Sequence, residues 1–268
     1  MTYPSSDPYA TPSALPPKPG MDAPPMRYME AYSYIFAHPE WTTNVLLAAV
    51  CSLIPVVGNI VLLGYQYEII EAMHRFPGQL YPKFDFNRFS QYLMRGVWPF
   101  LVNLIVGVVI QIPIQCGNFT LMGLSAAAGG GGGEEAAGVA LGLGFLVFML
   151  FVIVLSVVVT LAMIPLLLRA GLSQEFGQAF KFAWIQDFIA KTWLEMLLTV
   201  LFLIATGSVA VFIGLLACCI GIIPAAVIIM MASAHLVGQL YTIFLARGGE
   251  PIPLKPWEGP APMVPPAM

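Results

Sequence analysis

Residues 44–82 read NVLLAAVCSLIPVVGNIVLLGYQYEIIEAMHRFPGQLYP and decide the topology of everything that follows them. The stretch begins as an apolar run, is interrupted by Pro55 and Gly58, and becomes amphipathic and charged after Gly64 and Tyr65. Proline removes a helical hydrogen bond and glycine tolerates almost any φ, so a helix break is expected between Pro55 and Gly58. Residues 42–75 therefore either cross a membrane once or fold back as a short re-entrant hairpin.

The composition of the whole chain is that of a membrane protein. Of its 268 residues, 59% are hydrophobic and only 9% are charged, whereas soluble domains carry about 25% charged residues. We predict an all-α, polytopic transmembrane helical bundle with about five to six membrane helices and amphipathic interfacial helices. The net charge of −3 comes without a basic, aromatic-rich patch, so no nucleic-acid partner is expected. No cofactor or metal motif is found, and none is expected.

Proline-rich segments flank the membrane domain. Eight prolines fall in the first 25 residues and seven after residue 250, which predicts disordered tails over 1–25 and 249–268 around a membrane domain over 26–248. The start has no basic n-region and no apolar h-region, so it does not read as a signal peptide. Within the membrane domain we expect interfacial helices at 26–41, 83–96 and 173–192, spans at 97–115, 139–168, 193–216 and 220–246, and a glycine-rich outer loop at 125–138.

The distribution of basic residues orients the bundle. Segments 65–96 and 169–193 and the C-terminal tail hold nine of the eleven lysines and arginines, whereas loop 115–138 and turn 217–221 hold none. The positive-inside rule therefore places the basic segments in the cytoplasm. If residues 42–75 form a hairpin, Lys18 and Arg27 are cytoplasmic too, and both termini of an inner-membrane protein lie inside. A single crossing would require the N-terminal tail to be translocated, so the hairpin is favoured.

A weak internal repeat supports the hairpin. Ala31-Tyr32-Ser33-Tyr34 resembles Ala179-Phe180-Lys181-Phe182, and each precedes a tryptophan, an apolar run and a proline. The spacings differ between the two copies, so chance matching stays open as an alternative. The residues that recur, or that mark the break, are candidate structural pivots: Pro55, Gly58, Gly64, Tyr65, Pro224, Gly238 and Tyr241.

Several of these motifs together resemble the DUF4013 family of prokaryotic membrane proteins. The resemblance rests on Pro39-Glu40-Trp41, Ile54-Pro55-Val56-Val57-Gly58, Gly64-Tyr65, Arg75 and Pro82-Lys83-Phe84-Asp85, and on the later Ala179–Phe182 and Gly238–Tyr241. It covers roughly residues 28–248 and leaves out both tails. It implies a multi-helix membrane protein and no activity, because the family has none assigned.

Polar side chains within the expected spans are candidate functional positions, because they are costly in lipid. His235 and Gln239 share one helical face with Thr242, whereas Asn59, Asn103 and Gln111 belong to the first two apolar stretches. Such groups also serve as ordinary interhelical hydrogen bonds, which is the more common role of a histidine like His235. Glu68, Glu71, His74 and Arg75 are expected to form a solvated helix face at the inner surface.

The four cysteines read as small apolar residues of membrane helices. Cys116 and the pair Cys218 and Cys219 all fall at the outer side, so a disulfide between Cys116 and either of them stays open.

Three functions fit these residues. A non-enzymatic scaffold that organises lipids or partner proteins is favoured by the aromatic interfacial segments and by the proline-rich tails, which could bind proteins. A small-molecule carrier is favoured by the helix breaks and the repeat. A membrane-embedded enzyme lacks any recognisable catalytic set, so the chain is expected not to be an enzyme. Membrane lipids and a second copy of the chain are the other expected partners.

Overall fold

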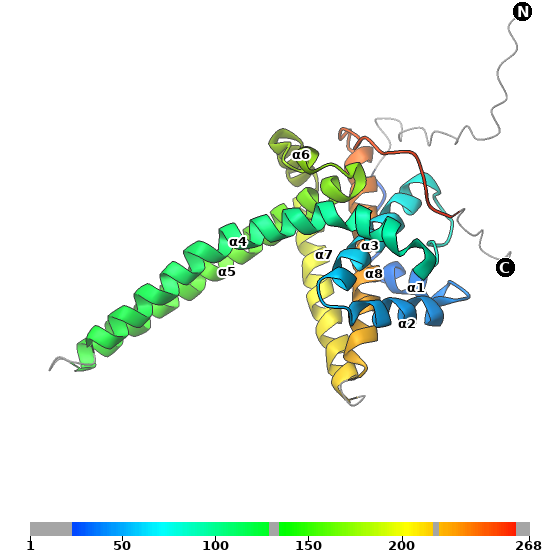
Figure 1. Ribbon diagram of the computed structural model, residues 1–268. Helices are drawn as coiled ribbons and strands as arrows, with labels where there is room; N and C mark the ends of the chain where they lie inside the picture. The colour runs from blue at the N-terminus through cyan, green and yellow to red at the C-terminus, as the bar shows by residue number, and fades with distance from the viewer. Residues whose placement is uncertain (1–22, 129–133, 217–219, 261–268) are drawn as a thin grey trace, which may run out of the picture.

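The computed structural model describes residues 23–128, 134–216 and 220–260, and over these residues the chain is all α-helical with no strand (Figure 1). This confirms the predicted fold class. Most of the N-terminal tail, the glycine run, Cys218 and Cys219, and residues 261–268 lie outside the described residues. The helices are α1 (Glu30–Phe36), α2 (Trp41–Ser52), α3 (Val57–Arg75), the 3-10 turn η1 (Phe86–Arg88), α4 (Phe89–Ala128), α5 (Glu134–Ser173), α6 (Phe176–Ala179), α7 (Phe182–Leu216) and α8 (Ile222–Ala246).

Residues 41–75 form two helices, α2 and α3, that meet at a tight turn. Pro55 lies in the turn, and the amide of Val57 donates to the Pro55 carbonyl over 2.6 Å. Val56 between them has a φ of 61°, a conformation that is strained for a β-branched residue. A methyl group at Gly58 would lie 2.0 Å from the carbonyl oxygen of Cys51. The two helices therefore approach so closely at the turn that only glycine fits there.

A second close approach joins α3 to α4. A methyl group at Gly64 would lie 1.8 Å from the Tyr92 carbonyl oxygen, and one at Gly96 would lie 1.8 Å from the Ile60 carbonyl oxygen. The two backbones thus touch at paired glycines, as small residues allow in membrane helix packing. Beside this crossing, the hydroxyl of the fully buried Tyr65 donates to the Pro82 carbonyl over 2.9 Å.

Three helices are longer than the sequence predicts. The span expected at 139–168 belongs to α5, and the described residues of the expected outer loop 125–138 are helical, at the end of α4 and the start of α5. The interfacial segment 83–96 and the span 97–115 were expected as separate helices, but most of both belongs to the forty-residue α4. Likewise α7 joins much of segment 173–192 to span 193–216. In α7 no proline or turn sequence separates the amphipathic part from the apolar part, whereas α4 continues through Gly96 and Pro99, which lie at this boundary. Pro224, a candidate structural pivot, is in the first turn of α8. The missing amide of a proline costs no helical hydrogen bond there, so Pro224 does not interrupt the helix.

Four helices are long and apolar enough to cross a membrane: residues Phe86–Ala126, Leu141–Ser173, Phe182–Leu216 and Ile222–Ala246. The shorter apolar helix α2 is not among them. α4 and α5 lie side by side as an arm that extends away from the other helices, and α7 and α8 form a second hairpin in a different direction (Figure 1). Each forty-residue helix of the arm is about 60 Å long, twice the hydrocarbon thickness, so the arm must tilt or protrude.

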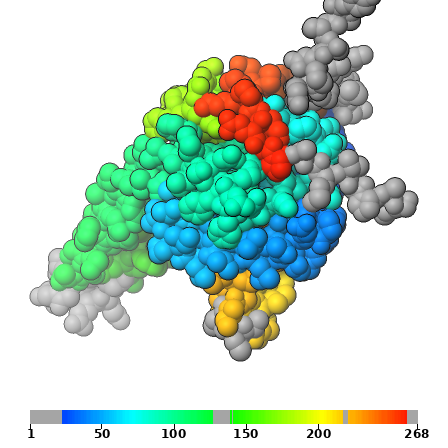
Figure 2. Space-filling view, turned by 45° about the vertical axis from the view of Figure 1, so that its right-hand side comes forward, coloured from blue at the N-terminus to red at the C-terminus, as the bar shows by residue number. Residues whose placement is uncertain are grey.

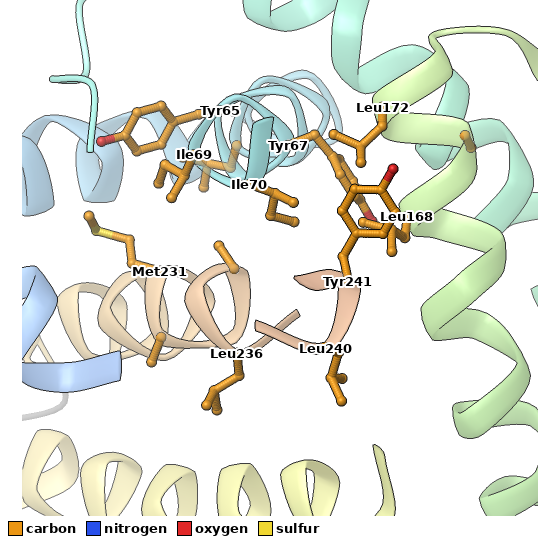
Figure 3. Packing of buried hydrophobic residues seen from close by; sticks show 14 of the residues in the cluster. Tyr65, Tyr67, Ile69, Ile70, Leu168, Leu172, Met231, Leu236, Leu240 and Tyr241 are labelled. Atoms are coloured by element: carbon orange, nitrogen blue, oxygen red, sulfur yellow. The ribbon is translucent and has the colours of Figure 1, made fainter. Parts of the chain in front are cut away.

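The hydrophobic core lies between α3 and α8 and is closed by the C-terminal end of α5 (Figure 3). Aromatic side chains fill much of it, and α1 and α2 also pack on α8. Figure 3 labels ten residues of this core: Tyr65, Tyr67, Ile69 and Ile70 of α3, Met231, Leu236, Leu240 and Tyr241 of α8, and Leu168 and Leu172 of α5. Of these, Leu236 and Leu240 point from α8 toward α7.

Residues 249–260, the C-terminal strap, differ from the disordered tail that the sequence predicts. They form an extended segment that lies across the surface of the bundle (Figure 2). The amide of Ile252 donates to the Tyr241 hydroxyl over 2.8 Å, and the indole of Trp184 donates to the Glu250 carbonyl over 2.7 Å. Ile252 is only 3% exposed. A buried isoleucine therefore anchors a segment whose prolines have no amide to satisfy.

Candidate functional site

A cluster of buried charges joins α3 to the start of α4. Glu68 and Glu71 lie one turn apart on α3 and are 3% and 1% exposed. Both oxygens of Glu68 accept from Arg88, over 2.6 and 2.7 Å, in a bidentate pair. Glu71 pairs with Arg95 of α4 and, over 2.7 Å, with Arg75 of its own helix. Three guanidinium groups thus surround two carboxylates.

The expectation that Glu68, Glu71, His74 and Arg75 form a solvated helix face is wrong. The chain after α3 returns through η1, which carries Arg88 onto the acidic face and excludes water from it. The C-terminal strap closes the cluster from the other side, since Arg75 donates to the Lys255 carbonyl and Arg95 lies 6.0 Å from the Trp257 ring centroid. Both carboxylates are occupied by arginines, so the cluster ties helices together and leaves no free acid or base.

Arg169 is a second buried charge that sequence reasoning missed. It was counted with the basic residues of a cytoplasmic segment, but it lies near the end of α5 and is fully buried. Its Nη2 donates to Gln178 over 3.2 Å, and its guanidinium lies 5.0 Å from the Trp184 ring centroid. Its Nε and Nη1 find no partner within the described part of the chain. The signal in the sequence is an arginine directly after a run of leucines.

Two of the predicted polar residues meet at one cavity. Asn59 of α3 and Asn103 of α4 both line a cavity of about 610 Å³ between α2, α3, α4 and α8. Gln66, which the sequence did not single out, also lines it and donates to the Ser233 hydroxyl over 3.1 Å. Gln111, in contrast, is exposed on the arm, farther along α4.

His235 and Gln239 lie elsewhere. Gln239 contacts the His235 ring nitrogen over 3.0 Å and also holds the backbone of Arg27. Both line a smaller cavity of about 190 Å³ with Thr242, at the N-terminal segment. His235 is 5% exposed and its ring packs 4.5 Å from that of Tyr34. The predicted polar face therefore exists, but it does not open into the cavity that holds Asn59 and Asn103.

A third polar group, at the loop between α1 and α2, is fully buried. His38 accepts the Glu40 amide on Nδ1 over 3.0 Å, and its ring packs 4.6 Å from that of Tyr81. The Tyr81 hydroxyl in turn donates to the Ile35 carbonyl over 3.0 Å. Burial lowers the pKa of His38, so its ring is neutral at pH 7. This burial could not be predicted from the sequence, because the aromatic neighbour of His38 comes from another part of the chain.

The comparison with known families adds one finding. The model of the family described as "Protein of unknown function (DUF4013)" matches residues 47–219, more than half of the chain.

The chain belongs to the DUF4013 family.

This match confirms the predicted family, although it covers less than the predicted range of 28–248 and leaves out Pro39-Glu40-Trp41 and Gly238–Tyr241. It includes the buried charges on α3 and α4 and also Asn59 and Asn103, but not His235. No curated protein and no solved structure matches the chain. The DUF4013 assignment therefore establishes a family whose function is unknown.

The buried ion pairs lead to the first prediction. Glu68→Gln leaves the Arg88 guanidinium without its bidentate partner in a buried site, so we expect a loss of about 3–5 kcal/mol of stability. The matched control is Asp187→Asn, which removes the 2.8 Å pair with Lys191 where Asp187 is 42% exposed. It should cost less than about 1 kcal/mol. Denaturant unfolding of the purified protein in detergent measures both values, and equal losses would show that the cluster does not hold the helices.

Proposed function

We propose that this DUF4013 protein is a non-enzymatic membrane protein that organises lipids around its α4–α5 arm, in the inner membrane, with both termini in the cytoplasm. The observation that carries the proposal is the uncovered surface of the arm. In the most apolar window of α5 no residue is buried, and in that of α4 only 11% of residues are. The outer parts of these two forty-residue helices are thus free to contact their surroundings.

The chemistry of the arm favours lipid as its contact. Its exposed side chains are large and aliphatic or aromatic, and a surface of this size facing water would aggregate. The hydroxyls of the arm donate to carbonyls of their own helix, as Thr120 and Thr160 do over 2.8 and 2.7 Å, and the Asn118 amide donates to Gln115 over 3.4 Å. The large exposed residues include Leu104, Val108, Phe119, Met122, Val147, Leu150, Phe151 and Val158.

The orientation follows from where the basic side chains gather. Arg75 and Arg95 contact the C-terminal strap, and Arg247 pairs with Glu195 beside it. The N-terminal segment begins near the same end, because Pro24 shares a cavity with Met73 and Thr242. The positive-inside rule assigns this end to the cytoplasm. A hairpin made by α2 and α3 leaves both termini there.

A carrier for small molecules is the second candidate. The 610 Å³ cavity with its two asparagines favours it, since ligand sites have volumes of about 300–1,000 Å³. The separation of this cavity from His235 speaks against a continuous polar pathway.

Protein partners belong to the proposal as well. A proline-rich sequence such as Pro16-Pro17-Lys18-Pro19 suits domains that bind polyproline helices. The corresponding C-terminal sequence Lys255-Pro256-Trp257 packs on Arg75, Phe76 and Arg95, so a partner would have to displace it.

Cysteine accessibility in intact cells tests the orientation. In a background without native cysteines, Ser125→Cys at the tip of the arm should react with a membrane-impermeant maleimide from outside, and Thr11→Cys should react only after the cells are opened. Gly78→Cys, in the loop after α3, is the matched inner control. Labelling of Thr11→Cys from outside would rule out the hairpin, and protection of Ser125→Cys would rule out the orientation.

A spin label on the arm tests what covers it. Val147 is 69% exposed, so a nitroxide attached to Val147→Cys reports what surrounds the arm. Oxygen dissolves in lipid, and we expect it to relax this nitroxide more than a water-soluble nickel chelate does. Gly78→Cys should show the reverse. Greater access of nickel at Val147→Cys would contradict the proposal. So would efficient disulfide cross-linking of Val147→Cys between two copies, which would show that a second chain covers the arm.

A further inference from the structure

The 610 Å³ cavity presents carboxamides that nothing in the protein satisfies. Asn59 and Asn103 are both exposed to it, and neither side chain makes a hydrogen bond within the described residues. Asn103 lies inside the α4 span, where an unpaired amide that faces hydrocarbon is unfavourable. Such groups persist where they meet a hydrogen-bonding ligand or water.

We propose that this cavity binds the head of an uncharged membrane lipid that carries hydroxyl and carbonyl groups. This inference rests on the proposal that lipid surrounds the bundle. None of the described residues that line the cavity is charged, so neither an anionic phosphate nor an ammonium group finds a counter-charge there. A carboxamide both donates and accepts, which matches hydroxyl and ester groups.

The other polar groups of the cavity are already engaged. The Ser52 hydroxyl donates to the Ala49 carbonyl over 2.6 Å, and the Gln66 amide nitrogen donates to the Ser233 hydroxyl. Asn59 and Asn103 therefore supply most of the recognition, with the Gln66 carbonyl oxygen as a further acceptor. The two asparagines come from different helices, so a ligand in the cavity can form hydrogen bonds with both α3 and α4.

A second cavity offers a place for the acyl chain. It measures about 390 Å³, is lined by α3, α5, α7 and α8, and shares Gln66 with the first cavity. Its hydroxyls face inward to their own helices, since Thr160 donates to Ser156 and Thr199 to Glu195, each over 2.7 Å. Apart from Gln66, the Tyr67 hydroxyl and Ser233, whose hydroxyl donates to the Met230 carbonyl over 2.7 Å, the remaining wall is aliphatic or aromatic, so this cavity is mostly apolar. A polar cavity that adjoins an apolar one suits an amphiphile.

The bilayer has direct access to the polar cavity. Leu53, directly after Ser52, is 61% exposed, and Leu104, directly after Asn103, is 50% exposed. In the proposed arrangement this exposed apolar surface faces the bilayer, so a lipid can enter the cavity sideways without leaving hydrocarbon. On entering, the lipid head replaces its hydrogen bonds to neighbouring lipid heads with hydrogen bonds to Asn59 and Asn103.

Native mass spectrometry of the full chain in detergent tests the site, with dioleoylglycerol as the uncharged probe and dioleoylphosphatidylglycerol as the anionic one. We expect dioleoylglycerol to bind at least about tenfold more tightly than the anionic lipid. The double variant Asn59→Leu/Asn103→Leu should weaken dioleoylglycerol binding by about tenfold or more, because two hydrogen bonds are lost. Replacing unpaired amides with leucine suits a lipid environment, so this variant should fold.

Two further variants make the result decisive. Gln111→Leu removes an exposed amide from the same helix outside the cavity and should leave the affinity unchanged. Ala226→Phe fills the cavity while keeping both asparagines and should weaken binding as the double variant does. Wild-type affinity in the double variant, tighter binding of the anionic lipid, or no binding of dioleoylglycerol would each overturn the inference. Because the arm is tested separately at Val147, failure here leaves the proposed function standing.

Discussion

The bidentate pair between Glu68 and Arg88 is the interaction on which the arrangement of the helices depends. It fixes the start of α4 on α3 at the point where the arm leaves the core. Buried carboxylates lose several kcal/mol of hydration, so each must be fully paired. Arg95 and Arg75 complete this pairing at Glu71. The cluster therefore specifies one register between α3 and α4, and the paired glycines Gly64 and Gly96 permit it.

That register determines what the rest of the molecule presents to the membrane. With α4 held on α3, the arm diverges from the α7–α8 hairpin and keeps its apolar surface uncovered (Figure 1). The same divergence leaves the cavities around Gln66, one lined with free carboxamides and one effectively apolar. The contact between α3 and α4 thus has two results: a core held together by buried ion pairs, and two hairpins that face lipid. The C-terminal strap protects that contact by lying over Arg75 and Arg95.

Composition and periodicity predicted the fold class, and the resemblance of several short motifs to DUF4013 predicted the family, because all of these features are local in the sequence. The break after Ser52 was readable from Pro55 and Gly58 for the same reason. The burial of Glu68 and Arg169 was not readable, since it depends on which distant helix packs against them. The ordered C-terminal strap was not predicted, because its many prolines indicated a disordered tail and the single buried residue that anchors it, Ile252, gives no signal in the sequence. Asn59 and Asn103 were singled out separately as costly polar groups, but only the folded chain shows that they share a cavity.

Distance measurement by double electron–electron resonance tests the central claim that the buried ion pairs set the position of the arm. Nitroxides at Phe119→Cys on α4 and Phe212→Cys on α7, which are 71% and 62% exposed, report the separation of the two hairpins in lipid nanodiscs. We expect one narrow distance distribution in the otherwise unaltered chain and a broad or shifted one when Glu68→Gln is added. A distribution that stays equally narrow and unshifted in the Glu68→Gln chain would contradict it.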